Sequence, residues 1–149
     1  MGLSLNRLLR LQRIRSLQEQ QARMDLERAN NALHAAETAL AGHQQNRVDA
    51  QSAARGALLA GDRIEWHLAE AGREVSEWKI GQMEVLRKQR AEAVAPARAL
   101  YMEKRREEEQ IKILRAGVQS DIDVERKREE QRMSDEWFAQ RQYRGEIAN

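Results

Sequence analysis

The chain has 149 residues, one proline and no cysteine, with 4% aromatic and 34% charged residues. A globular domain of this size normally buries many aromatic and β-branched side chains, whereas most apolar residues here are Ala and Leu dispersed among Arg, Glu and Gln. The formal charge of +2 comes from 26 basic and 24 acidic residues that are interleaved, which argues against a nucleic-acid partner. The composition predicts long helices.

The absence of cysteine excludes disulfides and Cys-based metal sites, and it fits a reducing cytoplasm. No apolar run approaches the roughly 20 residues that a membrane span needs, so direct membrane insertion is not expected. The N-terminal segment "MGLSLNRLLRLQRIRSL" contains an arginine every few residues and no small-residue cleavage site follows it. We therefore interpret it as part of the mature, cytoplasmic protein.

The first predicted helix covers about residues 3–55, where the sequence has no proline and little glycine. Its apolar residues recur at heptad spacing, with a change of phase near Met24. The seam starts at Ile14, Leu17 and Met24 and continues through Ala22, Leu26, Ala29, Leu33, Ala36 and Leu40. Because Ala occupies every second position of the later part, this seam is thin and the helix requires a partner helix.

Gly56 and Gly61 bracket a turn expected at about residues 56–62, and Asp62 is suited to cap a second helix over about residues 63–142. The expected seam of this helix comprises Ile64, Leu68, Ala71, Val75, Trp78, Gln82 and Val85, then Leu100, Glu107, Ile111, Leu114 and Val118. Pro96 lies between the two parts, and a kink or a break is expected near Ala95.

Two amphipathic helices with a short turn predict an all-α fold, an antiparallel two-helix coiled-coil hairpin formed by residues 1–149 as a single unit. Pairing about a turn near residue 59 sets residue i opposite about residue 118 minus i, so that Leu40 faces Trp78. Everything beyond about Val118 then lacks a partner. About 20 further helical residues would project roughly 30 Å, and such a projection predicts a partner protein that encloses it.

Two segments carry a resemblance to a known family, namely "QRMSDEWFAQRQYRG", residues 131–145, and "AGDRIEWH", residues 60–67. Together with the length and helix layout of nearly the whole chain, they resemble the FliJ/YscO family, the central stalk proteins of flagellar and virulence type III secretion systems. The resemblance implies a non-enzymatic coiled coil similar to the rotary stalk of the F-type ATP synthase. The choice between a flagellar and a virulence system stays open.

The resemblance also implies the partners. The end that carries both termini is expected to enter the pore of a hexameric secretion ATPase and to promote its assembly and activity. The hairpin end is expected to reach the cytoplasmic domain of the membrane export gate, which makes the protein peripheral to the inner-membrane apparatus. Secretion chaperones are further expected partners.

The expected ATPase-binding residues lie near both termini and combine basic and apolar side chains. They are Arg7, Arg10, Arg13, Arg15, Met133, Trp137, Phe138 and Arg141. Guanidinium groups suit acidic or carbonyl-rich pore loops. Two alternatives stay open for the arginines: they are solvated while their leucine neighbours pack on the second helix, or they form a membrane-surface helix, for which the stretch is short and lacks interfacial aromatics.

Met133 and Trp137 share a helix face that no residue of the first helix is left to cover. Exposed aromatic residues on an unpaired helix are typical of a protein interface. The alternative is that Trp137 and Phe138 close a core seam or pack against each other.

A second, weaker set of site residues lies near the turn and is expected to contact the export gate. It comprises His43, Gln44, Arg47, Val48, Gln51, Trp66 and Glu70. Trp66 lies off the expected seam and should point outward, whereas Trp78 lies on it and should be core. An ordinary solvated coiled-coil face is the alternative for these residues.

Catalysis is poorly supported, because the expected register does not bring His34, His43 and His67 together and no Gly-rich phosphate loop is present. No cofactor is expected. The sequence thus favours a stalk that activates an ATPase. Two other functions stay open: a cytosolic coiled-coil chaperone or scaffold that holds a client or dimerises, and a basic membrane tether.

Overall fold

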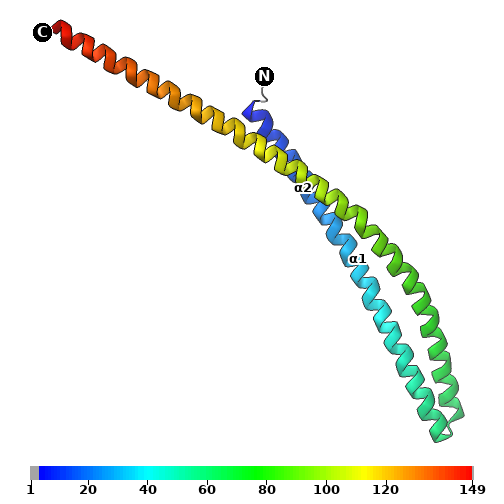
Figure 1. Ribbon diagram of the computed structural model, residues 1–149. Helices are drawn as coiled ribbons and strands as arrows, with labels where there is room; N and C mark the ends of the chain where they lie inside the picture. The colour runs from blue at the N-terminus through cyan, green and yellow to red at the C-terminus, as the bar shows by residue number, and fades with distance from the viewer. Residues whose placement is uncertain (1–3, 149) are drawn as a thin grey trace. The chain divides into compact units, whose positions relative to one another are not determined.

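The computed structural model describes residues 4–148, with side chains up to residue 145. Two α-helices make up nearly all of this part: α1, Leu5–Ala60, and α2, Arg63–Ala148 (Figure 1). No strand occurs among the described residues. The prediction of an all-α helical hairpin with a longer second helix is confirmed.

The turn between the helices consists of Gly61 and Asp62. Gly61 has a φ of 72°, and its amide donates to the carbonyl oxygen of Leu58 at 3.2 Å. The amide of Asp62 donates to the carbonyl oxygen of Ala57 at 2.9 Å, which completes a Schellman motif. The Asp62 carboxylate then accepts from the amide of Glu65 at 3.1 Å and caps α2. Since α1 continues through residue 56, the turn is shorter than the expected segment.

The chain divides into two compact units, each of which contains part of α1 and part of α2. Unit 2 comprises residues 20–103 and includes the turn, and its two helix segments lie side by side in Figure 1. Unit 1 comprises residues 1–19 and 104–149.

The core of unit 2 is a single seam of mainly small side chains. Its buried residues are Ala22, Ala36, Ala54, Ala57, Ser76, Ile80 and Val94. The expected seam positions from Ala22 to Leu40 are all buried or half-buried, which confirms that part of the prediction. The helices approach closely where a Cβ on Gly72 would lie 3.9 Å from the Cβ of Ala50. The expected register placed Gly72 opposite about Asn46 instead.

The expected seam of α2 in unit 2 is wrong. Trp78 is 64% exposed and Trp66 is half-buried, the reverse of the prediction. The other large members of the expected seam, Ile64, Leu68, Val75, Val85 and Leu100, are also exposed. The inward positions of α2 include Ser76, Ile80 and Met83, one or two residues after the expected positions, so a different face of this helix points toward α1. The Ala-rich seam of α1 then packs on Gly72 and Ser76, which allow a closer approach than Trp78 would.

Pro96 does not interrupt α2, so the expected break near Ala95 is absent. A proline inside a helix removes one backbone hydrogen bond and leaves the carbonyl of the residue four positions earlier without its donor. That residue is Glu92, and both Glu92 and Pro96 are exposed. Water can therefore solvate the carbonyl, and the helix tolerates the proline.

In unit 1 the start of α1 buries one apolar side chain fully, while Leu5, Leu9 and Leu11 are half-buried. Leu8 is fully buried, at 1% exposure, whereas Ile14 and Leu17 are exposed. The seam therefore has no change of phase. The positions at heptad spacing between Leu8 and Ala22 hold Gln12, Arg15 and Glu19, all of which are buried or half-buried. The expected seam start at Ile14, Leu17 and Met24 is wrong, because polar residues occupy the inward positions there.

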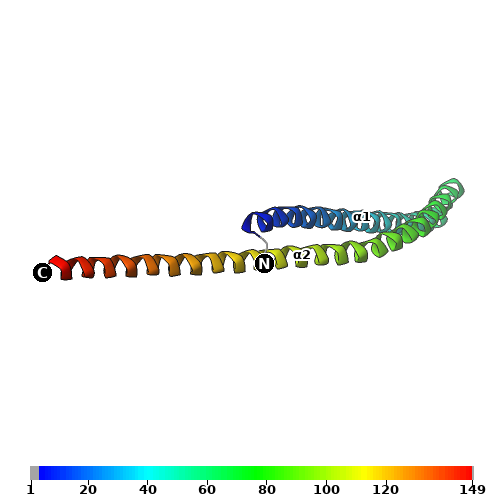
Figure 2. The ribbon, with the colours of Figure 1, turned by 90° about the horizontal axis from the view of Figure 1, so that it is seen from above.

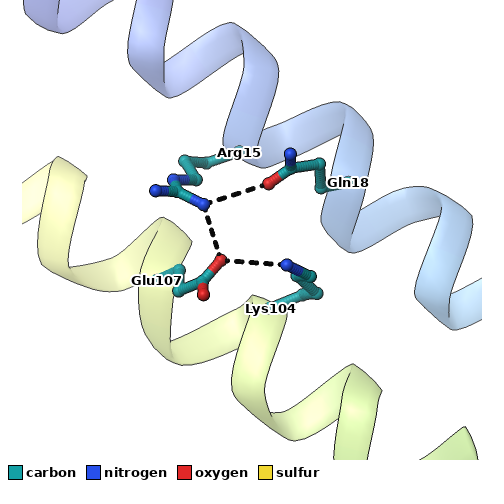
Figure 3. A network of polar contacts seen from close by, with 4 residues as sticks. All are labelled: Arg15, Gln18, Lys104 and Glu107. Carbon is teal, nitrogen blue, oxygen red and sulfur yellow. Dashed lines mark hydrogen bonds and ion pairs between the residues drawn. The ribbon is translucent and has the colours of Figure 1, made fainter.

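Direct polar contacts set the pairing of the helices in unit 1. Arg15 Nη1 lies 2.8 Å from Glu107 Oε2, and Arg115 Nη1 donates to Gln12 Oε1 at 2.8 Å. Lys104 and Gln18 complete the network around the first pair (Figure 3). Of the expected seam residues of α2 in this unit, Glu107, Ile111 and Val118 are half-buried and Leu114 is exposed.

Within unit 1, α2 continues well beyond the start of α1 (Figure 2). Every described side chain from residue 124 to residue 145 is exposed. At 1.5 Å per residue this overhang is roughly 30 Å long. The prediction that the end of the second helix lacks a partner within the chain is thus confirmed for the described side chains.

Candidate functional site

The overhang of α2, residues 124–145, carries the most exposed aromatic cluster of unit 1. Met133, Trp137 and Phe138 are each more than half exposed. Tyr143, which was not among the expected site residues, is 65% exposed. A helix this long without an apolar neighbour exposes all its faces, so these side chains are available to a partner.

The ring of Trp137 is held by its neighbours on the same helix. Its centroid lies 5.1 Å from that of Phe138 in an edge-to-face arrangement, and Arg141 Cζ lies 5.2 Å from the Trp137 ring. The two aromatics do pack against each other, as one alternative held. They nevertheless remain exposed, so the contact orients the rings and does not bury them.

A shallow hollow lies beside Trp137 and is lined by Gln140, Arg141 and Arg144. Among the described side chains, no carboxylate forms an ion pair with Arg141 or Arg144. Arg144 was missed by the sequence reasoning. Its signal is the spacing of Trp137, Gln140, Arg141 and Arg144 at i, i+3, i+4 and i+7, which places all four on one helix face.

The arginines at the start of α1 fall into two groups. Arg7, Arg10 and Arg13 are exposed. Arg15 is half-buried, pairs with Glu107 at 2.8 Å and contacts Gln18 at 3.2 Å. Arg15 therefore joins the helices, and the other three arginines form the outward basic surface.

The apolar residues at the start of α1 do not share one face. Leu8 points into the helix pair while Ile14 and Leu17 point outward. A membrane-surface helix needs its apolar residues on one side, so this arrangement disfavours the tether. Within residues 4–148, neither helix contains an apolar stretch long enough to cross a bilayer.

The residues expected to contact the export gate also divide into an exposed group and a half-buried group. Gln44, Val48 and Gln51 are exposed. His43 and Arg47 are half-buried on the seam, and Arg47 Nε is buried without a described hydrogen-bond partner.

Glu70 is engaged with its own helix. Its Oε2 accepts hydrogen bonds from Arg73 Nη2 at 2.8 Å and from Nε at 3.0 Å. These bonds, followed by the bond to Glu77, raise the pKa of Arg73 above its usual value. A partner would have to compete with Arg73 for the Glu70 carboxylate.

The turn carries an apolar surface that the sequence reasoning did not identify. Trp66 is half-buried, contacts His67 edge-to-face at 5.0 Å and lines a hollow. The other lining residues are Ala57, Leu58, Gly61, Asp62, Arg63 and His67. Around the turn, four exposed side chains form what we call the turn patch: Leu58, Leu59, Ile64 and Leu68. A two-residue turn cannot bury so many large apolar side chains. Four such residues on either side of the glycine turn were therefore the sequence signal for this exposed surface.

The three histidines lie apart on the hairpin, and the described residues contain no group of three potential metal ligands. The arrangement thus offers surfaces for protein contacts: the overhang with the outward arginines in unit 1, and the turn patch in unit 2.

Two antiparallel helices joined by a tight turn, with α2 continuing unpaired past α1, define the class of all-α helical-hairpin proteins. The family model described as "Flagellar FliJ protein" matches residues 4–147. The chain therefore belongs to the FliJ family, the non-catalytic stalk proteins of flagellar and type III export. No curated protein and no solved structure gives a significant match.

Proposed function

We propose that this chain is the central stalk of a type III export apparatus and that unit 1 binds the hexameric export ATPase and activates it. The observation that carries the proposal is the overhang, residues 124–145, which is fully exposed and bears Met133, Trp137 and Phe138. Such a helix has no apolar surface within the described chain to cover its aromatics.

A single helix is about 10–12 Å wide with its side chains, roughly half the width of a helix pair, so the overhang can enter a pore that a pair cannot. Trp137 and Phe138 are the kind of aromatic anchors that dominate binding energy in interfaces. Arg141 and Arg144, together with Arg7, Arg10 and Arg13, supply guanidinium groups for carboxylates and carbonyl oxygens.

The turn end is proposed to bind the cytoplasmic domain of the export gate. Its exposed polar residues Gln44 and Gln51 flank Val48 on α1. The turn patch adds a larger apolar surface than these residues offer. A stalk bound in this way is peripheral to the inner membrane, and secretion chaperones remain candidate additional partners.

The test mixes the purified chain with its cognate export ATPase and measures ATP turnover and hexamer formation. Wild type should stimulate both. A Trp137→Ala, Phe138→Ala double variant should bind at least about 30-fold more weakly, because two anchoring aromatics are lost. Trp78→Ala is the matched control, since Trp78 is a 64% exposed tryptophan of α2 in unit 2.

Either of two results would contradict the proposal: wild type fails to stimulate the ATPase, or the double variant stimulates it as well as wild type does. Sedimentation of the chain alone distinguishes the stalk function from the alternative of a self-associating scaffold. The stalk should sediment as a monomer at micromolar concentration.

A further inference from the structure

The first part of α1, residues 5–19, is held to α2 in an unusual way. We call it the α1 start segment. Leu8 is its only fully buried apolar side chain among the described residues. The helix pair of unit 2, by contrast, buries six apolar residues: Ala22, Ala36, Ala54, Ala57, Ile80 and Val94.

Polar side chains make the hydrogen bonds and the ion pair that join the α1 start segment to α2. Arg15 pairs with Glu107 at 2.8 Å, and Lys104 lies 3.4 Å from the same carboxylate oxygen (Figure 3). The side chains of Arg15 and Glu107 are still 35% and 26% exposed. Ion pairs that water and salt ions can reach contribute little to stability and weaken as the salt concentration rises.

The second polar contact is a hydrogen bond from the guanidinium of Arg115 to the side-chain amide oxygen of Gln12, at 2.8 Å. It is exposed as well, so water can replace it at small cost. Leu8 is thus the one fully buried apolar side chain of the described α1 start segment, while Leu5, Leu9 and Leu11 are half-buried.

The α1 start segment also has little helical stability of its own. Ser4 caps it, with its Oγ accepting from the amide of Arg7 at 3.3 Å, but the first turn has no acidic residue. Arg7 and Arg10 instead place positive charge near the positive end of the helix dipole. The segment is the end of the 56-residue helix α1, where helices fray, so contacts with α2 help to keep it ordered.

From these contacts we infer that the α1 start segment is a salt-sensitive latch, which detaches reversibly from α2 while the helix pair of unit 2 stays closed. Opening breaks the Arg15–Glu107 and Arg115–Gln12 contacts and exposes Leu8. It also uncovers residues 104–118 of α2, including Ile111 and Val118. Local openings of this kind occur in the least stable part of a structure.

The consequence rests on the proposed function. With the latch closed, a pore can take α2 as a single helix only along the overhang. With the latch open, the single-helix stretch grows by roughly 20 Å, the length of about 15 helical residues. The latch therefore sets how far α2 can be inserted, and Ile111 and Val118 become an additional apolar contact for the partner.

The test is hydrogen exchange of the full-length chain alone, at constant pH in 50 mM and 1 M NaCl. Amides of residues 9–19 should exchange faster than those of residues 26–57. Relative to that internal reference, their rate should rise about two- to five-fold at high salt, as expected for the loss of an exposed ion-pair network.

Two variants sharpen the result. Glu107→Gln should raise the exchange of residues 9–19 at low salt and remove most of its salt dependence. Glu129→Gln is the matched control, because it removes an ion pair with Arg132, at 3.2 Å, that joins no second helix. An Arg15→Leu, Glu107→Leu double variant should slow the exchange, since an apolar pair replaces the ion pair.

The latch is overturned if residues 9–19 exchange as slowly as residues 26–57 at both salt concentrations, or if Glu107→Gln changes nothing. The readout involves no ATPase. A failure of the latch is therefore distinguishable from a failure of the chain to activate the ATPase.

Discussion

The amide of Asp62 donates a hydrogen bond to the carbonyl oxygen of Ala57 at 2.9 Å, so the residue that caps α2 also closes the C-terminal end of α1. This contact requires Gly61 between the helices to adopt a left-handed backbone conformation, with a φ of 72°. A side chain at that position is strained whatever space surrounds it.

Gly61 and Gly56 should therefore respond in opposite ways to replacement by alanine. Gly61→Ala should lower the free energy of unfolding by about 1 kcal/mol, because alanine disfavours positive φ. Gly56 lies inside α1, and a Cβ added there would meet nothing within 4 Å, so Gly56→Ala should raise it by about 0.5–1 kcal/mol. Urea unfolding followed by circular dichroism measures both; equal shifts would show that the turn is not confined to Gly61 and Asp62.

Replacing Arg47 by methionine should make the protein more stable. The Nε of Arg47 is buried on the seam without a described hydrogen-bond partner, and an unsatisfied buried donor costs about 1–3 kcal/mol. Methionine keeps the length and helix propensity of the side chain without the donor. We expect Arg47→Met to raise the free energy of unfolding by about 1 kcal/mol.

Arg55→Met is the control for this change, because Arg55 lies on the same helix and is exposed. It should shift stability by less than about 0.5 kcal/mol. A loss of stability in Arg47→Met would mean that Arg47 makes a favourable contact through its other nitrogens.

The sequence predicted the helices well and their buried faces only in part. Helix propensity and the two glycines near Asp62 are local signals, so the hairpin and its longer second helix could be read directly. The buried face of α2 was not predictable in the same way, because large apolar residues occupy more than one face of this helix. The expected seam passed through Ile64 and Trp78, whereas the inward positions lie one or two residues later and include Trp66 and Ile80.

The other wrong prediction, the seam start at Ile14, Leu17 and Met24, arose because polar residues occupy the seam there. Gln12 and Arg15 occupy inward positions of the α1 start segment, where an apolar pattern cannot detect them. Their partners, Arg115 and Glu107, are about 90–100 positions away in sequence, so no local signal pairs them. The overhang, by contrast, follows from helix lengths alone, which is why its exposed aromatics were predictable.

The turn patch leads to a prediction about gate binding. Leu59 is 92% exposed and Leu58 is 64% exposed, so a Leu58→Ser, Leu59→Ser double variant removes little buried surface. It should weaken binding to the cytoplasmic domain of the gate by about ten-fold or more if these residues are anchors. Calorimetry with that domain measures the affinity.

Ile113→Ser is the matched control for the turn patch, because Ile113 is 70% exposed but lies in unit 1. It should leave gate affinity unchanged, and circular dichroism should show that all variants keep their helices. Unchanged affinity in the leucine variant would move the contact to Gln44, Val48 and Gln51.

The arginines beside Trp137 should contribute to ATPase binding through their position on the helix and not through charge alone. Arg141 and Arg144 share the face of Trp137 and lack a described carboxylate partner, so a partner's carboxylates can pair with them. An Arg141→Gln, Arg144→Gln double variant should bind the ATPase about ten-fold more weakly at low salt. Its affinity should also depend less steeply on salt than that of wild type.

Arg128→Gln distinguishes position from charge, because Arg128 lies nine residues before Trp137 and so on the opposite side of the same exposed helix. It removes a charge from the overhang without touching the Trp137 face, and it should change affinity less than two-fold. If Arg128→Gln weakens binding as much per charge as the double variant does, the overhang attracts the ATPase by net charge, and the face of Trp137 is not the contact surface.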